Sequence, residues 1–216
     1  MPDHHLYLSS VDGPHCAQPV AEHKPEAADR VLILLHGRGG LSWPVLQWGA
    51  THLPQAWVMA PQAMNNTWYP ERFMEPTASN VPYLESALAA VDALVLEAIR
   101  RGCAKDAIII GGFSQGACLA AEYLKRHPGP YAGGLIMSGG LIGTDSEVRE
   151  AVAGDMASTP VYIGCDEDDP HIPWSRVQDT IAYFDTRGAD VHIGKYQGLG
   201  HTIHPDAIKF IQAMAA

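Results

Sequence analysis

Long hydrophobic runs are missing from this sequence of 216 residues. A helix that crosses a bilayer needs about 20 mostly apolar residues, so we expect neither a membrane-spanning segment nor stable membrane insertion. The chain also begins without the basic segment and apolar stretch that mark a secretory signal. Cysteine is scarce, and a chain of this length can bury a sufficient core without disulfides. We therefore expect the four cysteines to be free thiols in a reducing compartment, namely Cys16, Cys103, Cys118 and Cys165.

This chain has few basic residues compared with its acidic residues. Fourteen Lys and Arg stand against 24 Asp and Glu, which gives a formal net charge of -10 at pH 7. This excess of negative charge opposes nonspecific binding to nucleic acid, so no nucleic-acid partner is expected. Internal repeats, low-complexity tracts and linkers are also missing. We expect a single domain over residues 1–216, with residues 1–30 forming an N-terminal edge strand or arm.

Short apolar runs alternate with helix-length segments from Val31 onward. This alternation is typical of βαβ units and predicts an α/β fold, with a mostly parallel central sheet and helices on both faces. Strands are expected at residues 31–35, 56–60, 107–111, 134–138, 161–164 and 191–195. Helices are expected from Pro82 to about residue 101, over 115–127 and 174–187, and from near Pro205.

Residues 61–80 follow neither a strand nor a helix period, although they are rich in large apolar side chains. Long unpatterned segments in compact domains are usually functional or disordered, and an aromatic one is a poor candidate for disorder. The segment could be a flap that covers the edge of the core, or it could form the wall of a pocket. We favour a substrate pocket lined by Trp68, Tyr69, Phe73 and Met74.

A nucleophile motif lies where an expected strand runs directly into an expected helix. Residues 112–116 read Gly-Phe-Ser-Gln-Gly and match G-x-S-x-G. The glycines are needed at such a turn because a Cβ at either position would crowd the neighbouring strand or helix. Ser114 is therefore the candidate nucleophile. The backbone N–H of Gln115 lies at a helix N-terminus, where it can stabilise an oxyanion.

Candidate partners for the serine follow the last two expected strands. A serine nucleophile needs an imidazole base held by a carboxylate, and in this kind of sheet the chain order is Ser, acid, His. His201 suits the base, because the ends of parallel strands meet at one edge of the sheet. Three carboxylates remain open as the acid. Asp166 could brace the loop, Asp168 could be exposed to solvent, and Asp169 precedes a proline that would fix its backbone.

A glycine-rich loop follows the first buried strand, at His36-Gly-Arg-Gly-Gly40. This loop is in the position that supplies the second oxyanion N–H, and its glycines allow the backbone to approach a substrate carbonyl closely. A nucleotide-binding loop is the other interpretation, but the G-x-G-x-x-G spacing fails after Gly40. We expect His36 to be a structural residue that is hydrogen-bonded under the loop.

Together these motifs resemble the phospholipase/carboxylesterase family of small α/β-hydrolases, which includes acyl-protein thioesterases and bacterial carboxylesterases. The resemblance rests on residues 36–40, 112–117, 169–173 and 200–201. It implies an α/β-hydrolase fold and a cytoplasmic enzyme, and homodimers are frequent in the family. It selects Asp169 as the acid, because the family places its acid immediately before P-x-[VI]-P. It also implies backbone oxyanion donors at Arg38 and Gln115.

Two features depart from the thioesterase pattern. Arg38 occupies a position where thioesterase relatives tend to carry an apolar residue, and residues 65–70 look more like the bacterial carboxylesterase branch. These departures argue against lipidated proteins as substrates. The segment 139–146 is too short to insert a helical cap, so we expect no lid domain, and its Leu141 is expected to add to the substrate pocket.

The expected function is hydrolysis of short- to medium-chain carboxylic esters through an acyl-enzyme intermediate, with a small-molecule ester as the partner. No cofactor is required. His204 follows His201 closely, but no third ligand is evident, so no metal site is expected. A thioesterase or lactone hydrolase with the same triad is an alternative. A non-catalytic ligand-binding protein on this fold is another, and such a protein usually has a broken triad.

Overall fold

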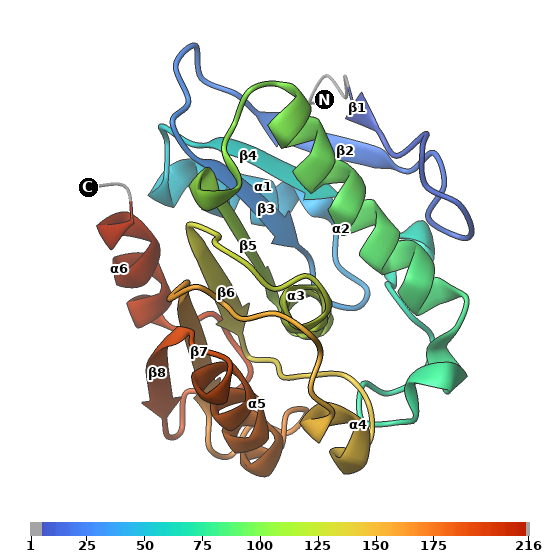
Figure 1. Ribbon diagram of the computed structural model, residues 1–216, viewed down its shortest axis with the longest axis vertical. Coiled ribbons are helices and arrows are strands. Elements are labelled where there is room, and N and C mark those ends of the chain that lie inside the picture. The colour runs from blue at the N-terminus through green and yellow to red at the C-terminus, as the bar shows by residue number, and fades with distance from the viewer. Residues whose placement is uncertain (1–5, 215–216) are drawn as a thin grey trace.

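An eight-stranded sheet runs through the centre of the computed structural model, which describes residues 6–214 (Figure 1). Its strands lie in the order β1-β2-β4-β3-β5-β6-β7-β8. The pairs β1·β2 and β2·β4 are antiparallel and all the other pairs are parallel, which confirms the mostly parallel sheet. The strands are β1 (Leu6–Tyr7), β2 (Pro19–His23), β3 (Val31–Leu35), β4 (Trp57–Pro61), β5 (Ile108–Phe113), β6 (Gly133–Met137), β7 (Pro160–Asp166) and β8 (Asp190–Tyr196).

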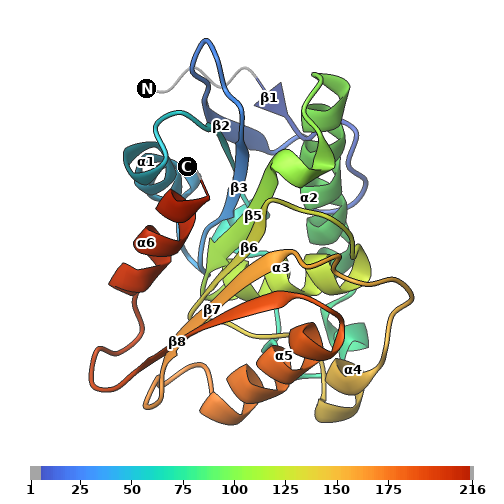
Figure 2. The same cartoon turned by 60° about the vertical axis from the view of Figure 1, so that its left-hand side comes forward.

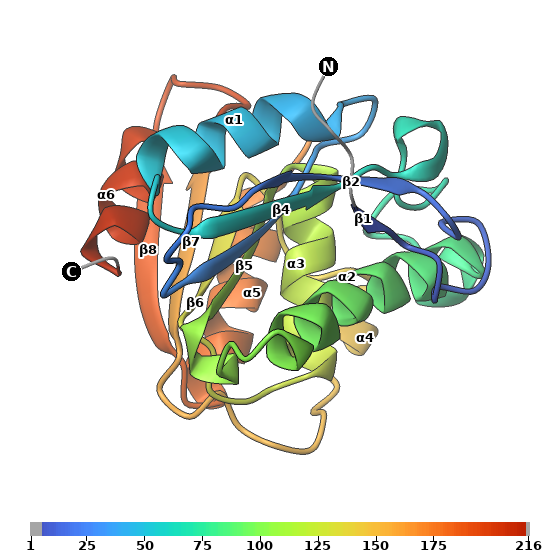
Figure 3. The same cartoon turned by 90° about the horizontal axis from the view of Figure 1, so that it is seen from above.

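Helices cover both faces of the sheet, as predicted. One face carries α2 (Tyr83–Arg100), α3 (Gln115–Arg126) and α5 (Trp174–Thr186), and the other carries α1 (Ser42–His52) and α6 (Pro205–Ala213) (Figures 2 and 3). The short helix α4 (Asp145–Arg149) packs against α5. Short 3-10 turns occur at Met64–Asn66, Thr77–Asn80 and Lys105–Ala107. All four cysteines are free, as expected from the sequence.

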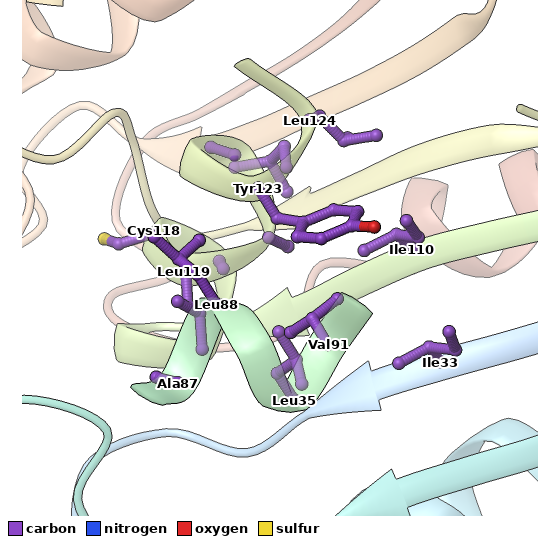
Figure 4. Packing of buried hydrophobic residues seen from close by; sticks show 14 of the residues in the cluster. Ile33, Leu35, Ala87, Leu88, Val91, Ile110, Cys118, Leu119, Tyr123 and Leu124 are labelled. Carbon is purple, nitrogen blue, oxygen red and sulfur yellow. The ribbon is translucent and has the colours of Figure 1, made fainter. Parts of the chain in front are cut away.

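Strand β3 shows why the sheet needs both helical layers. Its alternate side chains Ile33 and Leu35 join the cluster beneath α2 and α3, whereas Leu32 and Leu34 join the cluster beneath α1 and α6. Figure 4 shows Leu35 beside Val91 of α2. Burying one such side chain stabilises the folded state by on the order of 1.5–3 kcal/mol. A strand buried on both faces therefore reads as a continuous apolar run.

Strand β2 and helix α1 are among the elements that were not predicted from the sequence. Strand β2 pairs antiparallel with β4, but its fully buried residues are only Val20 and Ala21, too few for a recognisable pattern. Helix α1 contains Pro44 in its first turn, where the missing N–H costs little. It also contains Gly49, where an added Cβ would lie 2.8 Å from a Leu34 methyl group. Both residues weaken the helical signal, although tertiary packing requires the glycine.

The connection from β6 to β7 contains a single helix, α4, within the described residues. Thr144 and Glu147 form a capping box at its start, so the helix is specified locally even though it is short. It is too short to form a cap over the sheet edge, so this connection contains no lid domain. No helix in residues 6–214 is long and apolar enough to cross a membrane.

Candidate active site

Ser114 lies between the last residue of β5 and the first residue of α3, as the motif predicts. Its backbone angles are φ 55° and ψ -120°, a conformation that is costly for a residue with a side chain. The Ser114 N–H donates to the carbonyl of Met137 at the end of β6, at 3.0 Å. The turn is therefore tied to the sheet, and it presents the serine side chain at the carboxyl edge of the parallel strands.

The glycines of the motif allow a very close approach between helix and sheet. A Cβ added to Gly116 would lie 2.2 Å from the carbonyl oxygen of Leu35, and one added to Gly112 would lie 2.4 Å from the backbone of Gly116. Real Cβ contacts are essentially never below 3.0 Å. Both positions therefore require glycine, which confirms the packing reason inferred from the motif.

His201 and Asp169 form the hydrogen-bonded pair expected of a base and its orienting acid. The distance from His201 Nδ1 to Asp169 Oδ2 is 2.7 Å, and the Asp169 side chain is fully buried. Asp169 Oδ1 accepts hydrogen bonds from the backbone N–H groups of His171 and Ile172. Burial acts to raise the pKa of Asp169, but the His201 hydrogen bond and these backbone donors outweigh it, so the pKa lies below its ordinary value. An ionised Asp169 only accepts hydrogen bonds, so Nδ1 carries the proton and Nε2 is free.

Asp166 joins the two loops that carry this pair. Its Oδ1 accepts from the backbone N–H of Asp168 at 2.9 Å, and its Oδ2 accepts from Leu199 and Gly200, at 2.5 and 3.0 Å. These bonds, first of all the one from Asp168, lower the pKa of Asp166. The side chain of Asp168 points to solvent. Of the three candidate aspartates, the structure therefore brings only Asp169 to His201, and it gives Asp166 the bracing role that the sequence left open.

Three further residues position His201 and were missed by sequence reasoning. Ser138, at the end of β6, donates its Oγ hydrogen to the carbonyl of Thr202 at 2.9 Å. The Phe113 ring lies 4.9 Å from the His201 ring, and the His171 ring meets His201 edge-on at 4.8 Å. His171 could have been suspected from its place directly after Asp169-Pro170. No local sequence signal points to Ser138, because its contact joins residues far apart in the chain.

The glycine-rich loop after β3 closes the other side of Ser114. A Cβ added to Gly37 would lie 3.3 Å from the Ser114 Cβ, so this loop reaches the serine. Gln115 begins α3, where the first N–H groups have no partner within the helix. Among the described residues, neither the Arg38 nor the Gln115 backbone N–H has a hydrogen-bond acceptor. Two free donors beside a serine can stabilise a developing negative charge on a substrate oxygen.

Ser114 and His201 line one open cavity of about 560 Å³, together with Gly37, Arg38 and Gln115. No hydrogen bond joins the side chains of Ser114 and His201 in the described part of the chain. Such bonds are often long in unliganded enzymes and shorten when the substrate binds. The cavity therefore collects the predicted nucleophile, base and oxyanion donors around one space.

The predicted pocket wall is only partly correct. Tyr69 and Phe73 line the cavity, whereas Trp68, Met74 and Leu141 do not. Trp68 is fully buried because its indole N–H donates to the carbonyl of His36 at 2.8 Å. Leu141 is fully buried in the core, and Met74 is partly buried and packs against the same core. Side-chain type identified this segment as a wall, but it did not show which aromatic residues face inward.

Two buried histidines hold the wall segment to the body of the protein. His36 Nε2 accepts the backbone N–H of Ala63 at 3.1 Å, and its Nδ1 donates to the carbonyl of Gly37. His15 Nδ1 accepts from Met64, and its Nε2 donates to the carbonyl of Trp68. Burial lowers the pKa of both imidazoles, which keeps them neutral and able to accept. The prediction that His36 is structural and lies under the loop is confirmed.

No cluster of three or more metal-ligating side chains occurs within residues 6–214. The two rings that suggested a metal pair have different neighbours. His201 pairs with Asp169, while His204 is the residue before α6 and its ring stacks on Tyr196 at 4.0 Å. His204 thus packs in the sheet layer beside β8.

Comparison with known proteins identifies the family. The profile of the Phospholipase/Carboxylesterase family matches residues 16–215. The crystal structure of a phospholipase/carboxylesterase from Dyadobacter fermentans is 36% identical, with a TM-score of 0.83 over 92% of this chain and 96% of that chain. Acyl-protein thioesterase 1 of Kluyveromyces lactis is 26% identical over 199 residues, which cover 83% of this chain and 87% of that protein. The Bacillus cereus carboxylesterase is 18% identical and shares the fold, with a TM-score of 0.72 over 92% of this chain and 93% of that chain. The expected α/β-hydrolase fold is thereby confirmed, and the chain belongs to the phospholipase/carboxylesterase family of hydrolases.

Proposed function

We propose that this protein is a serine hydrolase that cleaves small carboxylic esters through an acyl-enzyme intermediate. The observation that carries the proposal is the 2.7 Å bond between His201 Nδ1 and Asp169 Oδ2, made at the cavity that Ser114 also lines. This bond fixes the imidazole in the tautomer whose Nε2 can take a proton. We assign Ser114 as the nucleophile, His201 as the general acid and base, and Asp169 as the residue that orients the imidazole.

The proposed reaction proceeds in two halves. Ser114 Oγ attacks the ester carbonyl carbon while its proton passes to His201 Nε2, and the carbonyl oxygen becomes an oxyanion. The backbone N–H groups of Arg38 and Gln115 donate hydrogen bonds to that oxygen. His201 then returns the proton to the departing alkoxide, which leaves as an alcohol. Water repeats these steps on the acyl-enzyme, releasing the carboxylic acid and restoring the serine.

The ionised Asp169 explains how His201 can accept a proton. Each half-reaction passes through an imidazolium, whose positive charge must be stabilised in a partly buried site. Asp169 supplies that counter-charge, and its lowered pKa keeps it charged at neutral pH. His171 also lines the cavity, but the imidazole that is hydrogen-bonded to the ionised Asp169 is that of His201.

The limited size of the cavity favours substrates with short- to medium-chain acyl groups. Each buried methylene contributes about 0.8 kcal/mol to binding until the chain reaches the wall, and Tyr69 and Phe73 bound the cavity. Thioester or lactone hydrolysis would use the same residues, and the similarity to acyl-protein thioesterase 1 supports the thioester alternative. A non-catalytic binding role is less favoured because all the triad side chains are present. Cytoplasmic location and homodimer formation stay predictions from the family resemblance.

Replacing the nucleophile tests the core of this proposal. Ser114→Ala should lower kcat for a butyrate ester by on the order of 10⁶, since the attacking oxygen is lost while the cavity remains. Ser175→Ala, at an exposed position on α5, is the control and should match the wild type. Steady-state kinetics on both variants, with thermal unfolding to verify the fold, measures the effect. A Ser114→Ala rate within about tenfold of wild type would rule out this nucleophile.

Substitutions of the three aspartates should differ in whether they lower kcat or Tm. Asp169→Asn should lower kcat by on the order of 10⁴, because the imidazole loses its tautomer control and counter-charge. Asp166→Asn should mainly lower Tm, because one amide oxygen cannot serve both loops that the carboxylate joins. Asp168→Asn, at an exposed position, is the control for both measurements. The role assignment fails if Asp166→Asn or Asp168→Asn reduces kcat more than Asp169→Asn does.

Acyl chain length tests the substrate class. Across acetyl to palmitoyl esters of one chromogenic alcohol, kcat/KM should rise over the first few carbons and then fall. Phe73→Ala removes a side chain that lines the cavity and should move the maximum to longer chains. Met74→Ala, its neighbour outside the cavity lining, should leave the maximum in place. A wild-type maximum at palmitoyl, or an unchanged profile in Phe73→Ala, would contradict the proposed limit on size.

A further inference from the structure

The side chain of Gln115 binds the backbone of the cavity wall. Its Oε1 accepts the Trp68 N–H at 3.0 Å and the Thr67 hydroxyl at 3.2 Å, and its Nε2 donates to the Tyr69 carbonyl at 2.8 Å. The side chain is buried, where hydrogen bonds are stronger than in water. Gln115 thus pairs with backbone groups of two successive residues, Trp68 and Tyr69, through both its acceptor and its donor. Because it belongs to the first turn of α3, it holds the start of the wall at a fixed distance from Ser114.

The side chain of Arg38 binds the next stretch of the same wall. Its Nη1 donates to the Pro70 carbonyl at 2.8 Å and its Nη2 to the Glu71 carbonyl at 2.7 Å. The Gly39 N–H also donates to the carbonyl of Asn66 at 2.7 Å. A guanidinium presents its donors in a rigid fork, so this contact restrains orientation as well as distance. The glycine-rich loop is therefore anchored to the wall at two places.

The two oxyanion donors differ in how they are supported. The Gln115 N–H is held by α3 and by the close contact of Gly116 with β3. The Arg38 N–H belongs to an exposed loop that contains three glycines, one of which, Gly39, has φ 74°. Glycine backbone is conformationally permissive. Inside the loop, the peptide group that carries the Arg38 N–H is held by hydrogen bonds from His36 Nδ1 and the Gly40 N–H to the Gly37 carbonyl. The wall supports the same loop from outside, through the Arg38 side chain and the Gly39 N–H.

We propose that Arg38 is a positioning residue, whose guanidinium uses the cavity wall to set the position of its own backbone N–H for the oxyanion. Support passes from α3 through the Gln115 amide to the backbone of Tyr69, then along the wall to Pro70, and from there through the guanidinium to the glycine-rich loop. An acyl group that packs against Tyr69 stabilises this path. The fit of the substrate then speeds acyl transfer instead of only tightening binding. The inference rests on the proposed ester hydrolysis.

The test removes the guanidinium but keeps the backbone N–H. Arg38→Met retains the side-chain length, and Arg38→Lys retains a single donor group. Thr77→Val is the matched control, because Thr77 anchors the other end of the segment to Glu147 at 2.6 Å and does not line the cavity. For each variant, kcat and KM are measured with a butyrate ester. Inhibition is measured with a trifluoromethyl ketone, whose serine adduct carries an oxyanion, and with the matching amide, which forms no adduct.

Arg38→Met should lower kcat about tenfold to 100-fold, somewhat less than the loss of a whole oxyanion donor, with KM within about threefold of wild type. Affinity for the trifluoromethyl ketone should fall in parallel while that for the amide is unchanged. Arg38→Lys should recover part of the loss, and Thr77→Val should stay near wild type. The inference is overturned if Arg38→Met keeps its kcat, if the loss is confined to KM, or if Thr77→Val loses as much. A wild-type protein that hydrolyses no ester would instead overturn the proposed function.

Discussion

The contact between Gly116 and the Leu35 carbonyl is the constraint on which the site depends. It brings the first turn of α3 against the end of β3, where an added Cβ would lie 2.2 Å from the oxygen. The chain can then pass from β5 into α3 with Ser114 as the only residue between them, which requires the strained φ of 55°. The same contact between α3 and β3 places the Gln115 N–H opposite the loop that follows β3. The positions of the proposed nucleophile and of the Gln115 N–H thus both follow from one backbone contact.

The proposed acid and base, Asp169 and His201, are positioned in a different way. They lie on loops after β7 and β8, and no glycine packing fixes them against the sheet. The Asp166 carboxylate instead gathers backbone N–H groups from both loops, and Ser138 at the end of β6 restrains the residue after His201. The site therefore combines a rigid half, built from tight backbone packing, with a half that depends on buried side-chain hydrogen bonds.

Sequence reasoning succeeded where the signal was local. The doubly buried β3 and the G-x-S-x-G turn could be predicted because their patterns lie within a few consecutive residues. Strand β2 was missed because its identity comes from pairing with β4, and α1 because tertiary packing requires Gly49 within it. The inward-facing wall residues were partly mistaken, since the orientation of Trp68 depends on the distant His36 carbonyl. The contacts of the Arg38 side chain were likewise not predictable, because its acceptors are backbone carbonyls of another loop.

The most direct test of the account is to observe the covalent intermediate. The protein would be mixed with a p-nitrophenyl butyrate substrate, quenched in acid within the first turnover, digested and mapped by mass spectrometry. The account predicts one butyryl group per chain, carried by Ser114, and its loss on longer incubation as water completes the reaction. Absence of any butyryl adduct during active turnover, or an adduct on a different side chain, would contradict the assignment of Ser114 and with it the proposed mechanism.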